Sequence, residues 1–175
     1  TNPLRQVFMM GVVWFLANQR KNSYLNLLEV GSWGGAYALT WGQGLELYNN
    51  SSGRITCIDA WRPYYAPDTI FDELSKNIND ALLGEDPYNV FLNNIEYIHQ
   101  EIDLIIHKGW SSDIFPKLEQ DSFDLIYIDG DHSYENVSDD IEASCKLIKE
   151  GGIICGDDLE LQGHQVETSI IEKIP

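Results

Sequence analysis

Basic residues and cysteines are scarce in this sequence, and long apolar runs are missing. The 175 residues include 11 lysines and arginines against 28 aspartates and glutamates, which gives a net charge of −17. A surface this acidic repels nucleic-acid phosphates and anionic membranes, so we expect neither as a partner. It attracts cations, including metals and cationic cofactors, although solubility alone explains the charge equally well.

The three cysteines, Cys57, Cys145 and Cys155, are odd in number and widely spaced. This argues against a disulfide framework or a zinc site and predicts buried, reduced thiols in a cytoplasmic protein. The longest apolar run, 8–17, is much shorter than the ~20 residues of a membrane span, and no signal-peptide cleavage pattern follows it. The length suits one domain covering residues 1–175.

Short apolar runs alternate with amphipathic segments along the chain. We expect strands at 24–30, 54–59, 102–107, 123–129 and 153–156, and helices at 4–20, 36–48, 68–83, 88–100 and 134–149. This alternation predicts right-handed βαβ units. The expected fold is therefore a Rossmann-like, doubly wound α/β fold, with a mainly parallel sheet and helices on both faces.

Three of the expected helices carry specific predictions about their ends and faces. Asp68 is the expected cap of helix 68–83, and Gly151-Gly152 is expected to end helix 134–149. One face of each helix is expected to be buried: Phe71, Leu74, Ile78 and Leu82 in the first; Phe91, Ile95 and Ile98 in helix 88–100; Val137, Ile141, Cys145 and Ile148 in the last.

Every expected strand ends at a glycine or a polar residue. In parallel α/β sheets ligands bind beyond the carboxyl ends of the strands. These residues should therefore converge on one site: Gly31, Asp59, Gly109, Asp129 and Asp157.

The turn after the first strand reads EVGSWGG, residues 29–35. Its glycines permit a sharp turn and a close approach to a ligand. A dinucleotide-binding turn needs glycine where Trp33 stands, and this bulky side chain would block a pyrophosphate. A ligand without phosphates fits better. Asp59, at the end of the second strand, can accept hydrogen bonds from ribose hydroxyls or serve only as a helix cap.

Three further features are open to two interpretations each. Ser111 and Ser112 fit a helix N-terminus better than a binding loop when composition alone is considered. The long segment 61–100 carries aromatic residues suited either to stacking on a substrate or to a satellite core. His132 is placed to act as a general base, as a structural hydrogen-bond donor or as an outer partner of a metal.

The acids Asp129, Asp157 and Asp158 carry the chemistry that we expect. Three carboxylates at neighbouring strand ends would repel one another, and a divalent cation is the simplest compensation. All-oxygen ligands favour Mg²⁺, Mn²⁺ or Ca²⁺ over zinc. Such a metal would lower the pKa of a bound hydroxyl and direct it towards an electrophile.

Five motifs in register support a family resemblance. EVGSWGG, CIDAW, GWSSDIFPKL, FDLIYIDGDHSY and GGIICGDDL resemble, in this order, the class I SAM-dependent methyltransferases. The resemblance covers about residues 25–160. It is greatest to the family with an I-D-G-D-H-x-Y…G-G-x-I-x-x-D-D signature, which is related to catechol and caffeoyl-CoA O-methyltransferases and includes sugar- and antibiotic-tailoring enzymes.

The resemblance implies a role for each matched residue. S-adenosylmethionine (SAM) would be bound by the turn, by the second-strand end, by the third-strand loop and by Asp129: Glu29, Gly31, Ser32, Trp33, Gly35, Asp59, Ala60, Trp110, Ser111, Ser112 and Asp129. Asp129, Asp157 and Asp158 would hold Mg²⁺, and His132 and Asp129 would be catalytic. Asp158 departs from the catechol-type pattern, which has asparagine there.

The predicted function is methyl transfer from SAM to a hydroxyl of a sugar, phenol or natural product. The alternatives are a metal-independent or non-catalytic SAM-binding domain and, with Trp33 and the paired acids against it, a nucleotide-dependent oxidoreductase. Enzymes of this class end in two further strands, for which 17 residues after Asp158 are too few. We therefore expect those strands to be missing and leave a homo-oligomer open.

Overall fold

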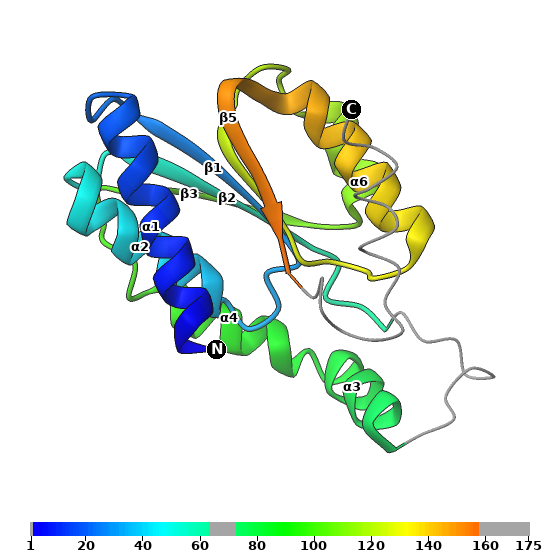
Figure 1. Ribbon diagram of the computed structural model, residues 1–175. Coiled ribbons are helices and arrows are strands. Elements are labelled where there is room, and N and C mark those ends of the chain that lie inside the picture. Colours follow the sequence, from blue (N-terminus) through cyan, green and yellow to red (C-terminus); the bar gives the residue numbers. More distant parts are fainter. Residues whose placement is uncertain (1, 64–72, 158–175) are drawn as a thin grey trace.

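The computed structural model describes residues 2–63 and 73–157 as a three-layer α/β fold (Figure 1). Five parallel strands form one sheet in the order β3-β2-β1-β4-β5. The predicted Rossmann-like fold is confirmed. The strands are β1 (Leu25–Val30), β2 (Gly53–Asp59), β3 (Asp103–Lys108), β4 (Phe123–Ile128) and β5 (Ile148–Gly156).

Helices cover both faces of this sheet. They are α1 (Pro3–Gln19), α2 (Ala36–Asn49), α3 (Glu73–Leu83), α4 (Asp86–Ile95), α5 (Ser111–Ile114) and α6 (Tyr134–Leu147), with a 3₁₀ turn at Phe115–Lys117. Asn2 caps α1 by accepting a hydrogen bond from the Leu4 N–H at 2.9 Å, and Pro3 fits the first helical position. Among the described residues, no helix is both long and apolar enough to cross a membrane.

Side-chain alternation along the strands builds two cores. Leu27 of β1 faces a core shared with α1, α2 and α4, in which Met9, Trp41 and Phe91 are fully buried. Its neighbour Leu28 faces the opposite core, which α6 covers with Val137 and Ile141 among others. The central strands β1, β2 and β4 are buried on both faces, as expected for a parallel sheet, whereas β3 and β5 at the edges are partly exposed.

The structure corrects two predictions about the last helix. Helix α6 ends at Leu147 without a glycine, and Gly151-Gly152 lies inside β5, where the pairing register with β4 shifts. Cys145 is exposed rather than buried, while Cys57 is buried and Cys155 is partly buried. The face of α6 turned to the sheet carries small serines instead of this thiol, because Ser138 and Ser144 pack there.

The segment 61–100 also differs from its prediction. Leu74 is 70% exposed, and Ser75, Asn79 and Leu82 form the buried side of α3. Helix α4 ends at Ile95 instead of continuing to 100. The described aromatic residues of the segment agree with the second interpretation, a core: Trp61 is 2% exposed and packs against Phe91, with ring centroids 4.8 Å apart. The proposed cap Asp68 lies outside the described residues.

Candidate active site

One large pocket opens at the carboxyl ends of the strands. Its volume is about 1270 Å³. The pocket lies where strand order reverses between β1 and β4, since β1 leads through α2 to β2 on one side and pairs with β4 on the other. This is the position at which open α/β sheets bind ligands. Ligand pockets are typically about 300–1,000 Å³, so this one has room for more than one small molecule.

The turn after β1 requires glycine at its first position. Gly31 has φ +89°, and a Cβ atom there would lie 1.9 Å from the carbonyl oxygen of Asp129. The turn therefore packs directly against the end of β4. Trp33, with φ 43°, follows in the same turn, and its side chain is 43% exposed at the pocket. The glycine thus serves close packing between the two strand ends that flank the switch point.

Asp59 joins two loops at the mouth of the pocket. Its Oδ2 atom accepts a hydrogen bond from the Trp33 N–H at 2.8 Å, and its Oδ1 atom accepts one from the Trp61 N–H at 2.7 Å. Burial raises the pKa of this carboxyl group, and the two backbone hydrogen bonds lower it. Asp59 also lines the pocket, so a carboxylate is fixed there. Such a group can accept hydrogen bonds from paired hydroxyls.

Glu29 lies beneath this turn rather than in the pocket lining. It is fully buried, and neither carboxylate oxygen has a hydrogen-bond partner among the described residues. Burial above all, together with the charges of Asp129 and Asp59, raises the pKa of Glu29 to about 8, although nearby Ser32 and Trp41 lower it without reaching good hydrogen-bond geometry. Glu29 is therefore protonated at neutral pH.

The opposite side of the pocket is formed by the loop after β3 and by α6. Trp110 is 41% exposed there, and Ser111 begins α5. The helix start predicted here is thus confirmed, but Trp110 occupies the N-cap position without a side-chain cap hydrogen bond, so neither serine is the cap. Asp140 of α6 lines the same region and is only 5% exposed. Burial raises the pKa of Asp140 to about 6, the Ser111 hydroxyl lowers it, and Asp139 and Asp131 raise it.

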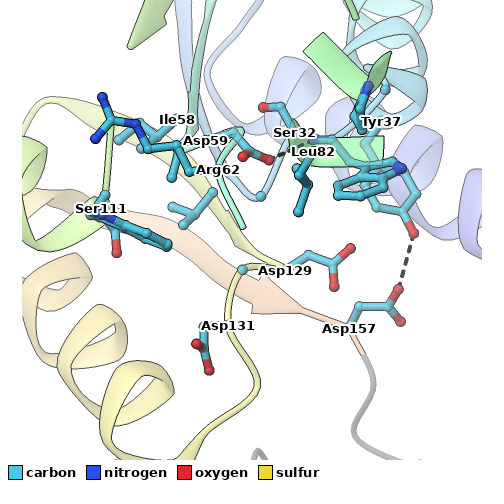
Figure 2. A pocket seen from close by; sticks show the side chains of 18 of the residues that line it. Ser32, Tyr37, Ile58, Asp59, Arg62, Leu82, Ser111, Asp129, Asp131 and Asp157 are labelled. Atoms are coloured by element: carbon cyan, nitrogen blue, oxygen red, sulfur yellow. Dashed lines mark hydrogen bonds between the residues drawn. The ribbon is translucent and has the colours of Figure 1, made fainter. Parts of the chain in front are cut away.

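The ends of β4 and β5 carry the acids of the site. Figure 2 shows Asp129 and Asp157 there, with the Tyr37 hydroxyl donating a hydrogen bond to Asp157 Oδ2 at 3.2 Å. Arg5 of α1 forms an ion pair with the same carboxylate and donates a hydrogen bond to the Tyr37 oxygen. Burial, followed by the charge of Asp129, raises the pKa of Tyr37 to about 12.

The structure brings most of the predicted site residues to this one pocket. Those that line it are Gly31, Ser32, Trp33, Asp59, Ala60, Trp110, Ser111, Ser112, Asp129, His132 and Asp157. Glu29 and Gly35 support the turn from outside the lining, and Asp158 lies outside the described residues. The roles assigned to these residues stay predictions.

Sequence reasoning missed several residues that line the pocket. They are Asn2, Arg5, Tyr37, Arg62, Asn94, Asn136 and Asp140. Arg5 and Asn2 come from the first turn of α1, and no local pattern indicates that this turn reaches the strand ends. For Asp140 a signal existed, because an acid stands one position before Ile141 on the side of α6 that faces the sheet.

The described residues do not by themselves form a metal centre. Residues 2–63 and 73–157 contain no group of three or more histidine, cysteine or acidic side chains arranged to hold an ion. Two of the three predicted ligands, Asp129 and Asp157, are present at neighbouring strand ends, but Asp157 is paired with Arg5. Crowding of uncompensated carboxylates, from which the metal was predicted, is thus partly relieved by the protein itself.

Sequence comparison decides the family. The profile of a methyltransferase domain family matches residues 28–159, which is most of the chain. The chain belongs to this family. The predicted resemblance to class I methyltransferases is therefore confirmed. No curated protein sequence matches this methyltransferase domain.

Solved structures share the fold of the methyltransferase domain. An O-methyltransferase from Bacillus cereus in complex with SAH is 18% identical, with a TM-score of 0.57; the match covers 98% of this chain and 67% of that one. The O-methyltransferase NovP is 15% identical, with a TM-score of 0.67 and coverages of 96% and 69%. A TDP-rhamnose 3′-O-methyltransferase of calicheamicin biosynthesis is 18% identical, with a TM-score of 0.56 and coverages of 99% and 72%. The domain thus spans about two thirds to three quarters of these chains.

Proposed function

We propose that the domain transfers a methyl group from SAM to a hydroxyl group of a small molecule such as a sugar, a phenol or a natural product. The observation that carries this proposal is the single pocket that joins the Gly31 turn and Asp59 to the acids Asp129 and Asp157. Its volume accommodates a cofactor and an acceptor together. The SAH complex of the Bacillus cereus enzyme supports SAM as the cofactor.

The residues of the turn fit SAM. In this proposal the fixed carboxylate of Asp59 accepts the ribose hydroxyls, and the Gly31–Trp33 turn contacts the methionine part. The exposed face of Trp110 and the hydroxyls of Ser111 and Ser112 border the adenine. The buried Ser32 hydroxyl, which has no hydrogen-bond partner among residues 2–63 and 73–157, offers a further hydrogen bond at the turn. When bound, SAM supplies an electrophilic methyl group on a sulfonium centre.

The acceptor hydroxyl is placed at the acidic end of the pocket. The carboxylates of Asp129 and Asp157 orient it, and His132, which lines the same pocket, takes its proton. In-line geometry between the oxygen and the methyl carbon then makes the transfer effectively intramolecular. The acidic surface and the three unpaired cysteines agree with a small-molecule enzyme of the cytoplasm.

A divalent cation, for which we propose Mg²⁺, can assist the methyl transfer only if Asp157 is free to bind it as a ligand. Asp129 and Asp157 would be two of its ligands and Asp158 the third. Because Arg5 already pairs with Asp157, the metal-independent alternative has a specific observation in its favour. The proposed methyl transfer, with the hydroxyl oriented by Asp129 and Asp157 and deprotonated by His132, does not depend on the metal.

Calorimetric titration of SAM tests the cofactor part of this proposal. In EDTA the wild-type chain should bind SAM with a roughly micromolar Kd, about −8 kcal/mol. Asp59→Ala should weaken binding at least tenfold, because the Trp33 and Trp61 loops lose their common acceptor. Asp80→Ala, which removes an exposed acid of α3, is the control and should bind as the wild type does.

Methylation of a panel of hydroxylated sugars and phenols tests the reaction itself. Mass spectrometry should show products heavier by one methylene group. His132→Gln should lower kcat while the affinity for SAM is unchanged, since His132 acts on the acceptor. A folded wild-type chain that binds no SAM would contradict the proposal, and binding without any transfer would support the non-catalytic alternative.

A further inference from the structure

The carboxylate of Asp157 is held by a cation that belongs to the chain itself. One Nη atom of Arg5 pairs with Asp157 Oδ2, and the other donates to the Tyr37 hydroxyl. Tyr37 in turn donates to Asp157 Oδ2 at 3.2 Å, as Figure 2 shows. The three side chains thus close a ring at the end of β5, on the wall of the pocket.

This ring supplies a positive charge next to Asp157. The metal was predicted because the strand-end carboxylates lacked such a charge. The Asp157 side chain is only 11% exposed, so water hydrates this carboxylate poorly, whereas the Arg5 side chain is 26% exposed. A buried carboxylate requires a positive partner, and removal of that partner leaves an uncompensated charge. Arg5 supplies the partner, and its guanidinium also lies 5.7 Å from the Tyr37 ring centroid.

A divalent cation on Asp157 would meet Arg5 directly. Both would use the same carboxylate, and two cations within a few ångströms repel each other strongly where water is excluded. We propose that Arg5 and a divalent cation compete for Asp157, so that a metal binds the strand-end acids only after Arg5 has left. The inference rests on the proposed function in one respect, namely that Asp129 and Asp157 belong to the acceptor end of the site.

The placement of Arg5 allows such a departure. Arg5 lies in the first turn of α1, where Leu4 is 78% and Val7 70% exposed. The first fully buried residue of the helix is Met9. The helix is therefore anchored from Met9 onwards, and its first turn can move without breaking a core contact. Figure 1 shows the N-terminus of α1 near the end of the sheet to which the β5 arrow points.

A titration with Mn²⁺ alone tests the competition. Electron paramagnetic resonance measures the Mn²⁺ that remains free at each step. Arg5→Gln should bind Mn²⁺ roughly tenfold or more tightly than the wild type, because the competing charge is gone. Arg20→Gln is the matched control. It removes another arginine of the N-terminal region whose partner, Asp124, is also buried but keeps Lys149 at 2.7 Å. This control should bind Mn²⁺ as the wild type does.

Two further variants locate the effect. Arg5→Lys keeps a cation and should keep the weak binding of the wild type. The double variant Arg5→Gln/Asp157→Asn should lose the gain, and it removes the unpaired charge that could prevent Arg5→Gln from folding. Thermal unfolding provides a second readout: MgCl₂, compared with EDTA, should raise the unfolding temperature of Arg5→Gln more than that of the wild type.

Equal Mn²⁺ affinity of the wild type and Arg5→Gln would overturn the competition, and so would the absence of binding by both. Neither result bears on methyl transfer, because SAM binding is titrated separately in EDTA. Conversely, a chain that binds no SAM but shows the predicted gain in Mn²⁺ affinity would refute the proposed function and leave the competition standing.

Discussion

At the scale of single residues, the buried acid Glu29 is the least expected feature of the site. A charged carboxylate without hydrogen-bond partners is unstable in a protein interior, and burial therefore raises its pKa to about 8. The sequence presents Glu29 as a cofactor-binding residue. That role stays a prediction; the structure places Glu29 beneath the turn, where its protonation state affects stability directly.

This position predicts a pH-dependent effect of Glu29→Gln on stability. Because the pKa is raised in the folded state, the contribution of Glu29 is fully present below about pH 4.5 and is lost as pH rises through about 8. Glutamine stays neutral throughout. Urea unfolding should show equal stability of the two proteins near pH 4, and a more stable variant at pH 9, by at most about 5 kcal/mol. A difference that does not depend on pH would contradict the assignment.

Two glycine-to-alanine substitutions, one in the crowded turn after β1 and one in open space on α1, test how tightly the turn is packed. Gly31→Ala forces a Cβ atom to within 1.9 Å of the Asp129 carbonyl oxygen, at φ +89°. Backbone would have to move, so we expect a loss of several kcal/mol in the free energy of unfolding. Gly11→Ala, in α1, meets nothing within 4 Å and should stabilise the protein by about 0.5–1 kcal/mol. Urea unfolding of both variants measures the contrast, and similar effects would refute this account of the turn.

At the scale of elements, α6 carries a buried acid on its pocket side. Asp140 is 5% exposed, and burial raises its pKa from 3.8 to about 6. Its stabilising contribution is present below about pH 3.8 and is lost as pH rises through about 6. The ionised carboxylate of Asp140 therefore lowers the stability of the folded protein at neutral pH, and the Ser111 hydroxyl offsets part of this loss.

Asp140→Asn should remove this penalty. We expect the variant to be more stable than the wild type at pH 8, by up to roughly 3 kcal/mol, and equal to it near pH 4. Glu135→Gln, an exposed acid of the same helix, should show no such change between the two pH values. Thermal or urea unfolding at both pH values makes the comparison. A less stable Asp140→Asn at pH 8 would show that the carboxylate is needed for packing against Ser111.

At the scale of the whole molecule, the net charge of −17 opposes compactness. Salt screens repulsion between exposed charges, and the screening length falls from about 30 Å at 0.01 M to about 8 Å at 0.15 M. The unfolding temperature should therefore rise when NaCl is raised over this range at pH 7.5. A fall in the unfolding temperature would mean that specific ion pairs, such as Lys149–Asp124, outweigh the general repulsion.

The sequence by itself determined the fold class and the edge of the sheet that carries the site. Apolar runs of strand length separated by helical segments permit few folds other than a parallel α/β sheet, and strand-end residues such as Asp59 and Asp129 necessarily meet at one edge. Only the tertiary structure decided what surrounds them. Arg5 reaches Asp157 across 152 positions of the chain, and burial makes Glu29 and Asp140 poor acids. Such effects depend on packing between distant elements, which local patterns do not encode.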